Sequence, residues 1–276
     1  MIIDAHQHLW QIGRNDQLWP TPDLPEIYRD FVAADLRDVT TACGISGTVL
    51  VQSQPSEADT LWLLSLAKAE PLVKAVVGWT DFVSPQAAER IAHLSRQPKL
   101  KGLRPMLQGL EDDWILQEAC RPALEEMTAS GLTFDALVFT RHLPAIDGIA
   151  KRYPALRIII DHGAKPPIAA GEMQPWADVI QRVAENPNIA CKLSGLLTEA
   201  GDNPITPYAD HLFEVFGPDR LLWGSDWPVV LLKSSYRDWF DWTTAWLANK
   251  DTAMRDAILG GNARRIYAFD EGPHHA

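Results

Sequence analysis

The chain opens with Met1-Ile2-Ile3-Asp4-Ala5-His6-Gln7-His8, a short apolar run that ends in two histidines one residue apart. Side chains of a β-strand point alternately to opposite faces, so His6 and His8 share a face and converge on one point. Convergent neutral imidazoles are ligands that zinc prefers. A single His-x-His pair is weak evidence, because neighbouring histidines are more often surface or core residues. The pair becomes informative through its place in the chain.

Seven more apolar runs follow the first at near-regular spacing. Most are continuously apolar, as expected of strands that are buried on both faces of a parallel sheet. The eight expected strands are 2–8, 47–53, 73–80, 100–104, 132–138, 157–161, 188–194 and 221–225. Amphipathic segments separate them, and Gly44, Gly131 and Gly217 stand where a glycine ends a helix. Eight strand–helix units predict an α/β protein, a (β/α)8 TIM barrel in a single domain over 1–276.

The main structural alternative is a doubly wound open sheet, which is disfavoured because no glycine-rich phosphate loop follows the first strand. Two segments fall outside the strand–helix pattern. Residues 10–25 are proline-rich and lack a helical period, so we expect a loop over the mouth of the barrel. The tail, residues 271–276, is expected to be disordered rather than metal-binding.

Composition limits the partners and the compartment. A net charge of −11 without a basic face argues against nucleic acid. No apolar run approaches the roughly 20 residues of a membrane span. No basic segment followed by an apolar stretch precedes the first strand, so we expect no signal peptide. Three scattered cysteines, Cys43, Cys120 and Cys191, form no C-x-x-C pair and indicate a reducing compartment. We therefore expect a cytoplasmic protein, monomeric or homodimeric, whose partner is a small molecule.

Polar residues stand at the ends of the expected strands, where a TIM barrel carries its active site. Such groups are costly to bury and rarely arise from packing alone. They include His6, His8, Gln52, Trp79, Asp81, Arg104, Asp161, His162, Lys192, Asp226 and Trp227. Three histidines and one aspartate among them could hold one divalent metal ion and leave a position open for water. The four candidate ligands are His6, His8, His162 and Asp226.

Taken together, these motifs resemble the amidohydrolase superfamily, and within it the branch often called amidohydrolase family 2. The stretches that match are Asp4-Ala-His6-Gln-His8, Asp161-His162-Gly163-x-Lys165-Pro166, Gly224-Ser225-Asp226-Trp227-Pro228 and Gly261-Asn262-Ala263. The branch contains sugar-lactone hydrolases of the L-fuconolactonase and L-rhamnonolactonase type, 2-pyrone-4,6-dicarboxylate lactonase-like enzymes and related decarboxylases. The resemblance implies that the four candidate ligands bind metal or substrate and take part in catalysis.

One departure from the superfamily pattern concerns the number of metal ions. Members with two metals have a bridging lysine or glutamate at strand four and a histidine at strand five. Here strand four ends in Leu103-Arg104-Pro105, and strand five contains Phe134-Asp135-Ala136. We therefore expect at most one divalent ion per chain and expect it to be zinc. The alternative is catalysis without a metal, in which the histidines donate hydrogen bonds to the substrate carbonyl.

Six further residues are assigned to substrate binding on unequal grounds. Lys192 has no obvious partner in its apolar strand, and tryptophans suit the apolar face of a sugar ring. Arg104 could instead pair with a neighbouring acid, and His142 could instead cap the helix that follows it. The six are Arg104, Lys192, Gln52, Trp79, Trp227 and His142. Ser194 and Ser225 lack a G-x-S-x-G context, which excludes a serine nucleophile.

The predicted activity is hydrolysis of a small lactone, a sugar (aldonic) lactone, by a carboxylic ester hydrolase of carbohydrate metabolism. Asp226 would accept a proton from the attacking water, while metal or imidazoles polarise the carbonyl. Few cations are available besides Arg104 and Lys192, which favours a neutral ring over 2-pyrone-4,6-dicarboxylate. A dicarboxylate lactonase or a metal-dependent non-oxidative decarboxylase is the alternative, and a non-catalytic small-molecule binding protein is a minor one.

Overall fold

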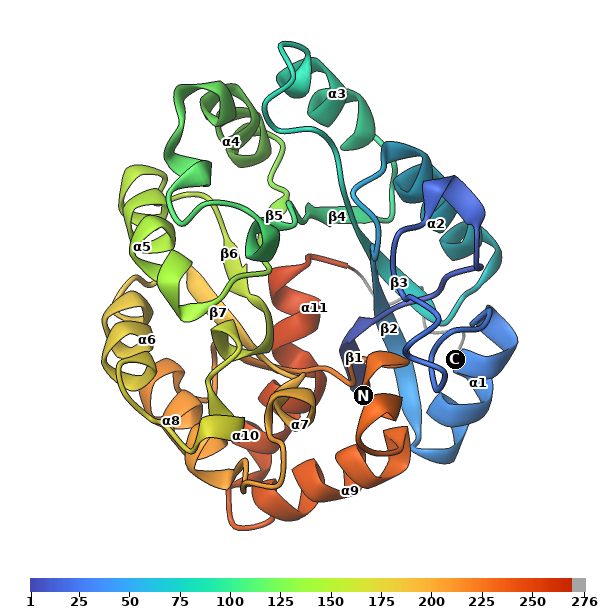
Figure 1. Ribbon diagram of the computed structural model, residues 1–276, viewed down its shortest axis with the longest axis vertical. Helices are drawn as coiled ribbons and strands as arrows, with labels where there is room; N and C mark the ends of the chain where they lie inside the picture. Colours follow the sequence, from blue (N-terminus) through green and yellow to red (C-terminus); the bar gives the residue numbers. More distant parts are fainter. Residues whose placement is uncertain (270–276) are drawn as a thin grey trace.

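Eight parallel strands form one sheet in the order β1 to β8, so strands adjacent in the sequence are adjacent in space. The computed structural model describes residues 1–269, and Figure 1 shows the strands in a ring with helices outside it. The strands are β1 Ile2–Gln7, β2 Ile45–Val51, β3 Val73–Gly78, β4 Leu100–Leu103, β5 Thr133–Ala136, β6 Ile158–Ile160, β7 Ile189–Leu193 and β8 Leu221–Trp223. The α-helices are α1 Ala33–Ala42, α2 Glu57–Ala69, α3 Ala87–Leu94, α4 Arg121–Ala129, α5 Leu143–Arg152, α6 Trp176–Ala184, α7 Leu196–Glu199, α8 Thr206–Phe216, α9 Tyr236–Leu247, α10 Thr252–Asp256 and α11 Asn262–Ile266. The predicted (β/α)8 architecture is confirmed.

The barrel closes between β1 and the segment just beyond β8. Gln7 forms a parallel bridge with Trp227, the amide of Asp226 donates to the carbonyl of His6 at 2.8 Å, and His8 donates to Trp227 at 2.7 Å. The closure therefore lies beyond the regular part of β8, toward the mouth, and the barrel is nearly rather than fully closed. An open sheet is excluded.

Asp4 strengthens this seam from the side that faces α9. Its carboxylate accepts hydrogen bonds from the Ser225 amide at 2.8 Å, the Ser225 hydroxyl at 2.6 Å, the His6 amide at 3.1 Å and the Tyr236 hydroxyl at 3.0 Å. Burial raises the pKa of Asp4 to about 6 despite these donors. Asp4 thus supports the site structurally.

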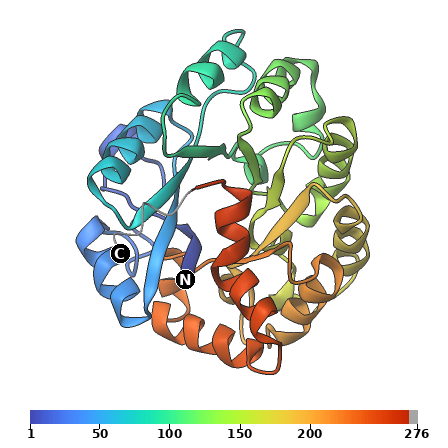
Figure 2. The same ribbon diagram turned by 180° about the vertical axis from the view of Figure 1, so that it is seen from behind.

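The end of the barrel opposite the mouth is closed by the C-terminal segment. Figure 2 shows α11 lying across the centre of the ring. Side chains of this segment pack against the inner faces of the strands in one buried cluster, which contains Ile3, Val49, Val77, Ile159, Leu222, Ala263, Ile266, Tyr267 and Phe269. Among residues 1–269, this plug fills the end of the barrel opposite the mouth, so a ligand would enter at the mouth.

The predicted element boundaries differ from the observed ones by at most two residues for the strands. The main-chain ladder continues past the regular pairing, since the amides of Gln52 and Arg104 donate to Val77 and Gly78 at 2.8 Å each. The amphipathic segment 116–130 is α-helical over only part of its length, because the 3₁₀ turns Trp114–Leu116 and Glu118–Cys120 precede α4. Residues 10–25 form the predicted loop, with one 3₁₀ turn, Arg14–Asp16. The expectation for 271–276 lies outside the described residues.

Two further sequence expectations concern the cysteines and membrane spans. Cys43, Cys120 and Cys191 are all buried and free, as expected of small apolar core residues. Among residues 1–269, none of the helices combines the length and apolar character that a bilayer crossing needs.

Candidate active site

Four side chains predicted as the centre of the site converge at the mouth end of the barrel. His6 lies in β1, His8 just after it, His162 after β6 and Asp226 after β8. The Nε2 atoms of His6 and His8 are 3.2 Å apart. Asp226 Oδ1 lies 3.7 Å from His6 Nε2, 3.4 Å from His8 Nε2 and 3.9 Å from His162 Nε2. The three imidazoles therefore surround one carboxylate oxygen.

The imidazoles are held in place from behind by groups on neighbouring strands. His8 Nδ1 lies 2.8 Å from the carbonyl oxygen of Val51, and His162 Nδ1 lies 2.8 Å from Ser194 Oγ. Gly195 has φ +64, and a Cβ there would come within 2.6 Å of His162 Nδ1. A side chain at position 195 would displace the His162 ring, which explains the glycine.

Left-handed backbone marks both polar loops that carry the site. His162, Ala164 and Lys165 have φ of 54, 61 and 51, and Asp226 has φ 56. This region is uncommon for residues with a Cβ and costs of the order of 1–3 kcal/mol each, and such strain clusters at functional sites. The strained turns direct His162 and Asp226 toward the barrel axis.

A buried layer of charges lies directly beneath the histidines. Lys192 Nζ lies 2.6 Å from Asp135 Oδ2 and 2.9 Å from Asp161 Oδ1, and Arg104 NH1 lies 3.2 Å from Asp161 Oδ2. Lys192, Asp135 and Asp161 have no exposed surface. Burial opposes the ionisation of Asp161, but Lys192 and Arg104 outweigh it and hold its pKa well below the usual range. Lys192 thus has two carboxylate partners, which corrects the expectation that it has none.

Asp226 is ionised at the centre of the site. Burial opposes its charge, but the imidazole of His162 outweighs burial and lowers the pKa of Asp226. Burial, reinforced by Lys192, lowers the pKa of His6 well below its usual value, so this imidazole is neutral. A carboxylate with a low pKa is available as a proton acceptor but is a weak base. Attack by water therefore depends on groups that make the water more acidic or the carbonyl more electrophilic.

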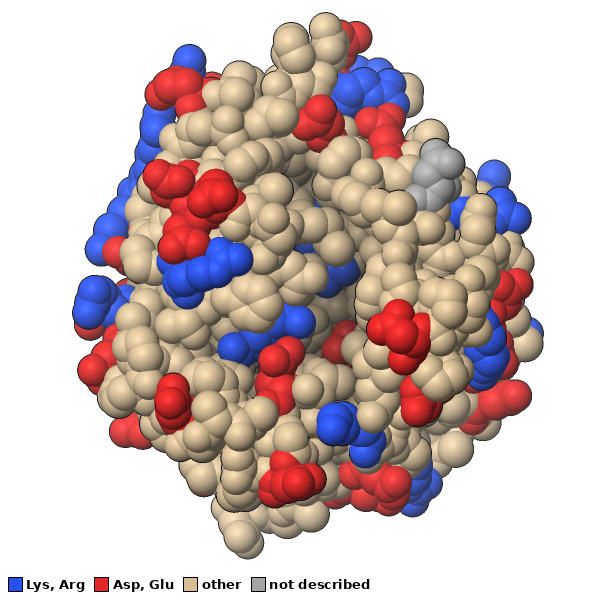
Figure 3. All heavy atoms as spheres, viewed as in Figure 1, with Lys and Arg blue, Asp and Glu red and all other residues tan. Residues whose placement is uncertain are grey.

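A cavity of about 260 Å³ opens above this centre, and Figure 3 shows a hollow in the middle of the mouth face with charged side chains in and beside it. Its lining residues are His8, Trp19, Ser53, Arg104, Met106, Gln108, Leu137, His162, Lys165, Asp226 and Val229. Lys165 is paired with Glu199 at 3.3 Å. The volume lies just below the usual range for ligand pockets and suits one small ring.

Of the six predicted substrate-binding residues, the structure brings Arg104 to the cavity wall and places the others elsewhere. Lys192 lies below the histidines in the charged layer. Gln52 is buried behind the wall, where its amide donates to the Arg104 carbonyl at 2.8 Å and to Met106 Sδ at 3.3 Å. Both were predicted correctly as strand-end residues, but the barrel interior occupies their polar groups.

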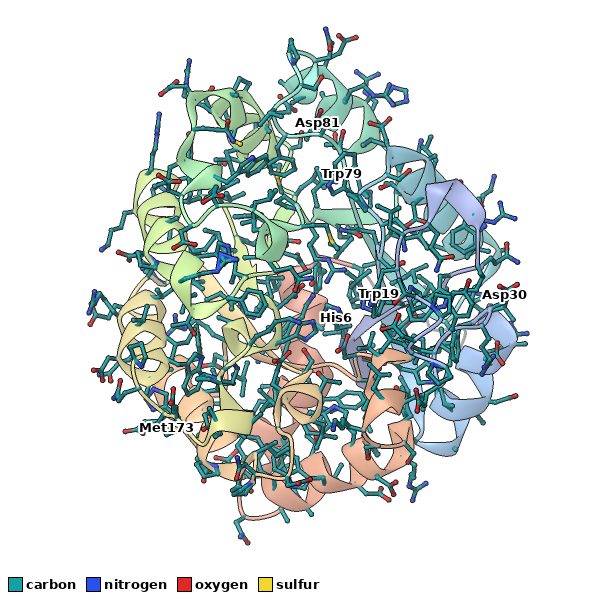
Figure 4. All side chains as sticks on the ribbon, in the orientation of Figure 1. His6, Trp19, Asp30, Trp79, Asp81 and Met173 are labelled. Carbon is teal, nitrogen blue, oxygen red and sulfur yellow. The ribbon has the colours of Figure 1, made fainter. Side chains whose placement is uncertain are left out.

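The two tryptophans and His142 are not among the residues that line the cavity. Figure 4 shows Trp79 and Asp81 toward the rim, away from His6. Trp227 is buried against the edge of Phe31, with ring centroids 5.1 Å apart. His142 is buried beside the start of α5, with Nδ1 3.0 Å from the Phe139 amide, so its alternative role as a capping residue describes the structure better.

Several residues that form the cavity were not predicted from the sequence. Trp19 comes from the expected mouth loop and lies near His6 in Figure 4, so the loop itself was the available signal. Ser53, Met106, Gln108, Leu137 and Val229 carry no motif. Asp135 lies in the charged layer beneath the cavity. Its sequence context could have indicated a buried ion pair, because a carboxylate in an otherwise apolar strand needs a buried partner.

Comparison with known proteins places the chain in a family. The model of the amidohydrolase family matches residues 3–269. The chain belongs to the amidohydrolase family. This amidohydrolase is 46% identical to an L-fucono-1,5-lactonase from Burkholderia ambifaria, over 99% of the chain and 98% of the relative. It is 33% identical to an L-fucono-1,5-lactonase from Burkholderia multivorans, over 98% of the chain and 96% of the relative. A crystal structure of a Burkholderia multivorans amidohydrolase with bound zinc has a TM-score of 0.92 and 33% identity, covering 98% of this chain and 100% of that one.

The donor set of this amidohydrolase fits a divalent metal ion. Zinc bonds of about 2.0–2.2 Å in a tetrahedral site place neighbouring ligand atoms about 3.3–3.5 Å apart. Separations of 3.2, 3.4 and 3.7 Å among His6 Nε2, His8 Nε2 and Asp226 Oδ1 are close to that spacing. Two imidazoles and a carboxylate form a donor set that zinc accepts.

Burial of His162 in the candidate site of this amidohydrolase predicts a pH-dependent stability. Burial lowers the pKa of His162 to about 4, whereas an unfolded histidine has a pKa near 6.5. Below pH 6.5 the unfolded state binds the proton more readily, so stability falls as the pH falls toward 4. Compared with His162→Gln, the free energy of unfolding of the unsubstituted protein should fall by about 2 kcal/mol more between pH 7 and pH 5. Urea unfolding with chelator present measures both curves, and parallel curves would contradict this assignment.

Proposed function

We propose that this protein is a lactonase that opens a sugar (aldonic) lactone by attack of water on the ring carbonyl. The observation that carries the proposal is the ionised Asp226 among three converging imidazoles at the base of a small cavity. The 46% identity to an L-fucono-1,5-lactonase over nearly the whole of both chains supports the same chemistry.

In this mechanism Asp226 accepts a proton from the attacking water as the oxygen bonds to the carbonyl carbon. The imidazoles of His6 and His162 lie beside Asp226 and stabilise the negative charge that develops on the carbonyl oxygen. The tetrahedral intermediate then collapses, the bond from the carbonyl carbon to the ring oxygen breaks, and the proton held by Asp226 passes to that oxygen. Arg104 lines the cavity, and its buried Nε has no partner among the described residues; we assign it to an oxygen of the ring.

The charges of the cavity favour a neutral substrate. Its two cations, Arg104 and Lys165, are paired with Asp161 and Glu199, and Asp226 adds a negative charge. A dicarboxylate would therefore meet no free cation on the wall, whereas hydroxyl groups can bond to Ser53 and Gln108. Trp19 offers an apolar surface for one face of a sugar ring.

We propose that at most one divalent ion, zinc, is bound per chain, held by His8, His162 and Asp226 with His6. When bound, such an ion acidifies water and polarises the carbonyl. Arg104 lies at the end of β4, where the two-metal members of the superfamily have a bridging ligand, and its positive charge opposes a second cation. Elemental analysis of protein purified without added metal is the check, and two equivalents per chain would contradict the proposal.

A panel of substrates tests the function directly. Neutral sugar 1,5-lactones, beginning with L-fucono-1,5-lactone, should release acid at least about 30-fold faster than 2-pyrone-4,6-dicarboxylate, because each unneutralised carboxylate costs about 2 kcal/mol or more. A pH indicator measures acid release, with enzyme-free buffer as the control for spontaneous hydrolysis. Release of carbon dioxide from aromatic acids would favour a decarboxylase. Faster hydrolysis of 2-pyrone-4,6-dicarboxylate would favour a dicarboxylate lactonase, and inactivity on every compound would favour a non-catalytic binding protein.

We also propose a cytoplasmic location, supported by the three free, buried cysteines. Fractionation of cells that express the tagged full chain tests it, and recovery outside the cytoplasm would contradict it.

A further inference from the structure

Lys192 contacts three acceptor groups at once, and one of them belongs to the catalytic centre. Its Nζ lies 2.6 Å from Asp135 Oδ2, 2.9 Å from Asp161 Oδ1 and 3.1 Å from His6 Nδ1. The side chain is fully buried, so water does not compete for these positions. The contacts with Asp135 Oδ2 and His6 Nδ1 are hydrogen bonds, and the contact with Asp161 Oδ1 is an ion pair.

The charge of Lys192 decides the direction of its contact with His6. Carboxylate oxygens of Asp135 and Asp161 lie 2.6 and 2.9 Å from Nζ, and such close carboxylates pair with an ammonium rather than a neutral amine. An ammonium has only donors, so His6 Nδ1 must accept with its lone pair. In a neutral imidazole the proton is then on the other nitrogen, Nε2, which faces His8 and Asp226.

The contacts of His8 agree with this direction from the opposite end. A carbonyl oxygen can only accept, so His8 Nδ1, 2.8 Å from Val51 O, carries a proton and donates. Neutral His8 therefore has a free lone pair on Nε2, which lies 3.2 Å from His6 Nε2. One hydrogen-bonded chain results: Lys192 donates to His6, His6 to His8, and His8 to the backbone of β2.

We propose that Lys192 is a positioning residue that holds His6 in the tautomer with its proton on Nε2, pointing into the reaction centre. Asp135 keeps Lys192 in place, since its carboxylate also accepts hydrogen bonds from Thr133 at 2.9 Å and Tyr267 at 2.5 Å. Tyr267 belongs to the C-terminal plug, so the bottom of the barrel is linked through Asp135 and Lys192 to His6.

This arrangement has two consequences for the site. The Nε2–H of His6, which His8 accepts in the free enzyme, is available to a substrate carbonyl oxygen in its place, a consequence that rests on the proposed function. His6 is also unprepared to ligate a metal through Nε2, because its proton must first move to Nδ1, away from Lys192. Asp161 Oδ1, 3.5 Å from His6 Nδ1, would then be the acceptor. The second consequence does not depend on the substrate.

The tautomer can be measured by nitrogen NMR on the full chain labelled with ¹⁵N-histidine, after chelator treatment, with a His6→Gln sample to assign the signals. We expect His6 to be protonated on Nε2 and His8 on Nδ1. A His6 protonated on Nδ1, or a His8 protonated on Nε2, would overturn the proposal. Neither result depends on catalysis, so failure of the lactonase assignment is distinguishable from failure here.

Two variants separate Lys192 from a general effect of the charged layer. Asp135→Asn keeps the ammonium, and His6 should stay protonated on Nε2. The double variant Lys192→Met/Asp135→Asn removes one cation and one anion, and His6 should shift its proton to Nδ1. An unchanged tautomer in the double variant would overturn the proposal. If that variant does not fold, the histidine signals of the unsubstituted protein and of Asp135→Asn still show whether His6 is protonated on Nε2.

Zinc affinity is a second measurement. If Lys192 had a purely structural role, its removal would not strengthen zinc binding. The double variant has the same buried net charge as the unsubstituted protein but lacks the hydrogen bond that zinc binding must break. By calorimetric titration with zinc chloride it should bind at least about tenfold more tightly. Equal or weaker affinity in a folded double variant would contradict the competition between Lys192 and metal.

Discussion

Asp226→Asn should lower kcat for the sugar lactone by about 10²–10⁴-fold while the protein remains folded. The amide occupies the same space and can still accept a hydrogen bond, but it cannot take the proton of the attacking water. Asp226 lies within 3.9 Å of the three imidazoles, and no other carboxylate lines the cavity. Among the residues that the structure describes, therefore, none can replace it. Steady-state kinetics with a pH indicator measure kcat and KM separately.

The matched control applies the same chemical change at Asp81, which lies toward the rim and caps a turn by accepting from the Val83 amide at 3.1 Å. Asp81→Asn should keep kcat within about twofold, since typical surface substitutions cost no more than about 0.5 kcal/mol. Circular dichroism and a thermal melt confirm that both variants fold. A near-normal kcat for Asp226→Asn would show that Asp226 is not the base.

Lys192→Met should lower the free energy of unfolding by about 3–5 kcal/mol. Methionine fills a similar volume, so the loss comes mainly from charge. Asp135 and Asp161 would be left facing each other in the barrel interior, with Arg104 the remaining cation beside Asp161. Urea unfolding at neutral pH gives the value, since Lys192 is charged and both carboxylates are buried there.

Two comparisons show whether buried charge is the cause. Adding Asp135→Asn to Lys192→Met removes one stranded carboxylate and should recover at least about 1 kcal/mol. Lys151→Met breaks the exposed pair with Asp147 at 2.7 Å, and this loss should stay below about 1 kcal/mol, because solvent screens surface pairs. If Lys192→Met and Lys151→Met cost the same, the buried layer contributes no special stability.

The architecture was predictable because it depends on periodic features of the chain. Each of the eight apolar runs became a strand within two residues of the expected bounds, since burial on both faces of a parallel sheet requires continuous apolar sequence. The placement of His6, His8, His162 and Asp226 at one centre followed from the same regularity. Carboxyl ends of parallel barrel strands meet at one face, so strand-end residues come together wherever they lie in the chain.

The direct roles of Lys192, Trp79, Trp227 and His142 were not predictable in the same way. A strand-end position places a residue near the axis, but whether its polar atoms face the cavity or a buried partner depends on neighbours from other strands. Lys192 is separated from Asp135 by 57 residues and from His6 by 186, so no local sequence pattern indicates that these residues are in contact. Cavity residues such as Met106 and Gln108 come from irregular loops, which have no periodicity to analyse.

The sequence by itself therefore determined the barrel, the mouth end as the location of the site and the identity of its central imidazoles and carboxylate. Hydrophobic periodicity and strand-end chemistry are local properties, and parallel closure converts them into a common centre. The tertiary structure alone decided which polar groups face the substrate, which are neutralised beneath it, and on which nitrogen His6 carries its proton. Those outcomes depend on contacts of 2.6–3.2 Å between residues far apart in the chain, which only the folded arrangement brings together.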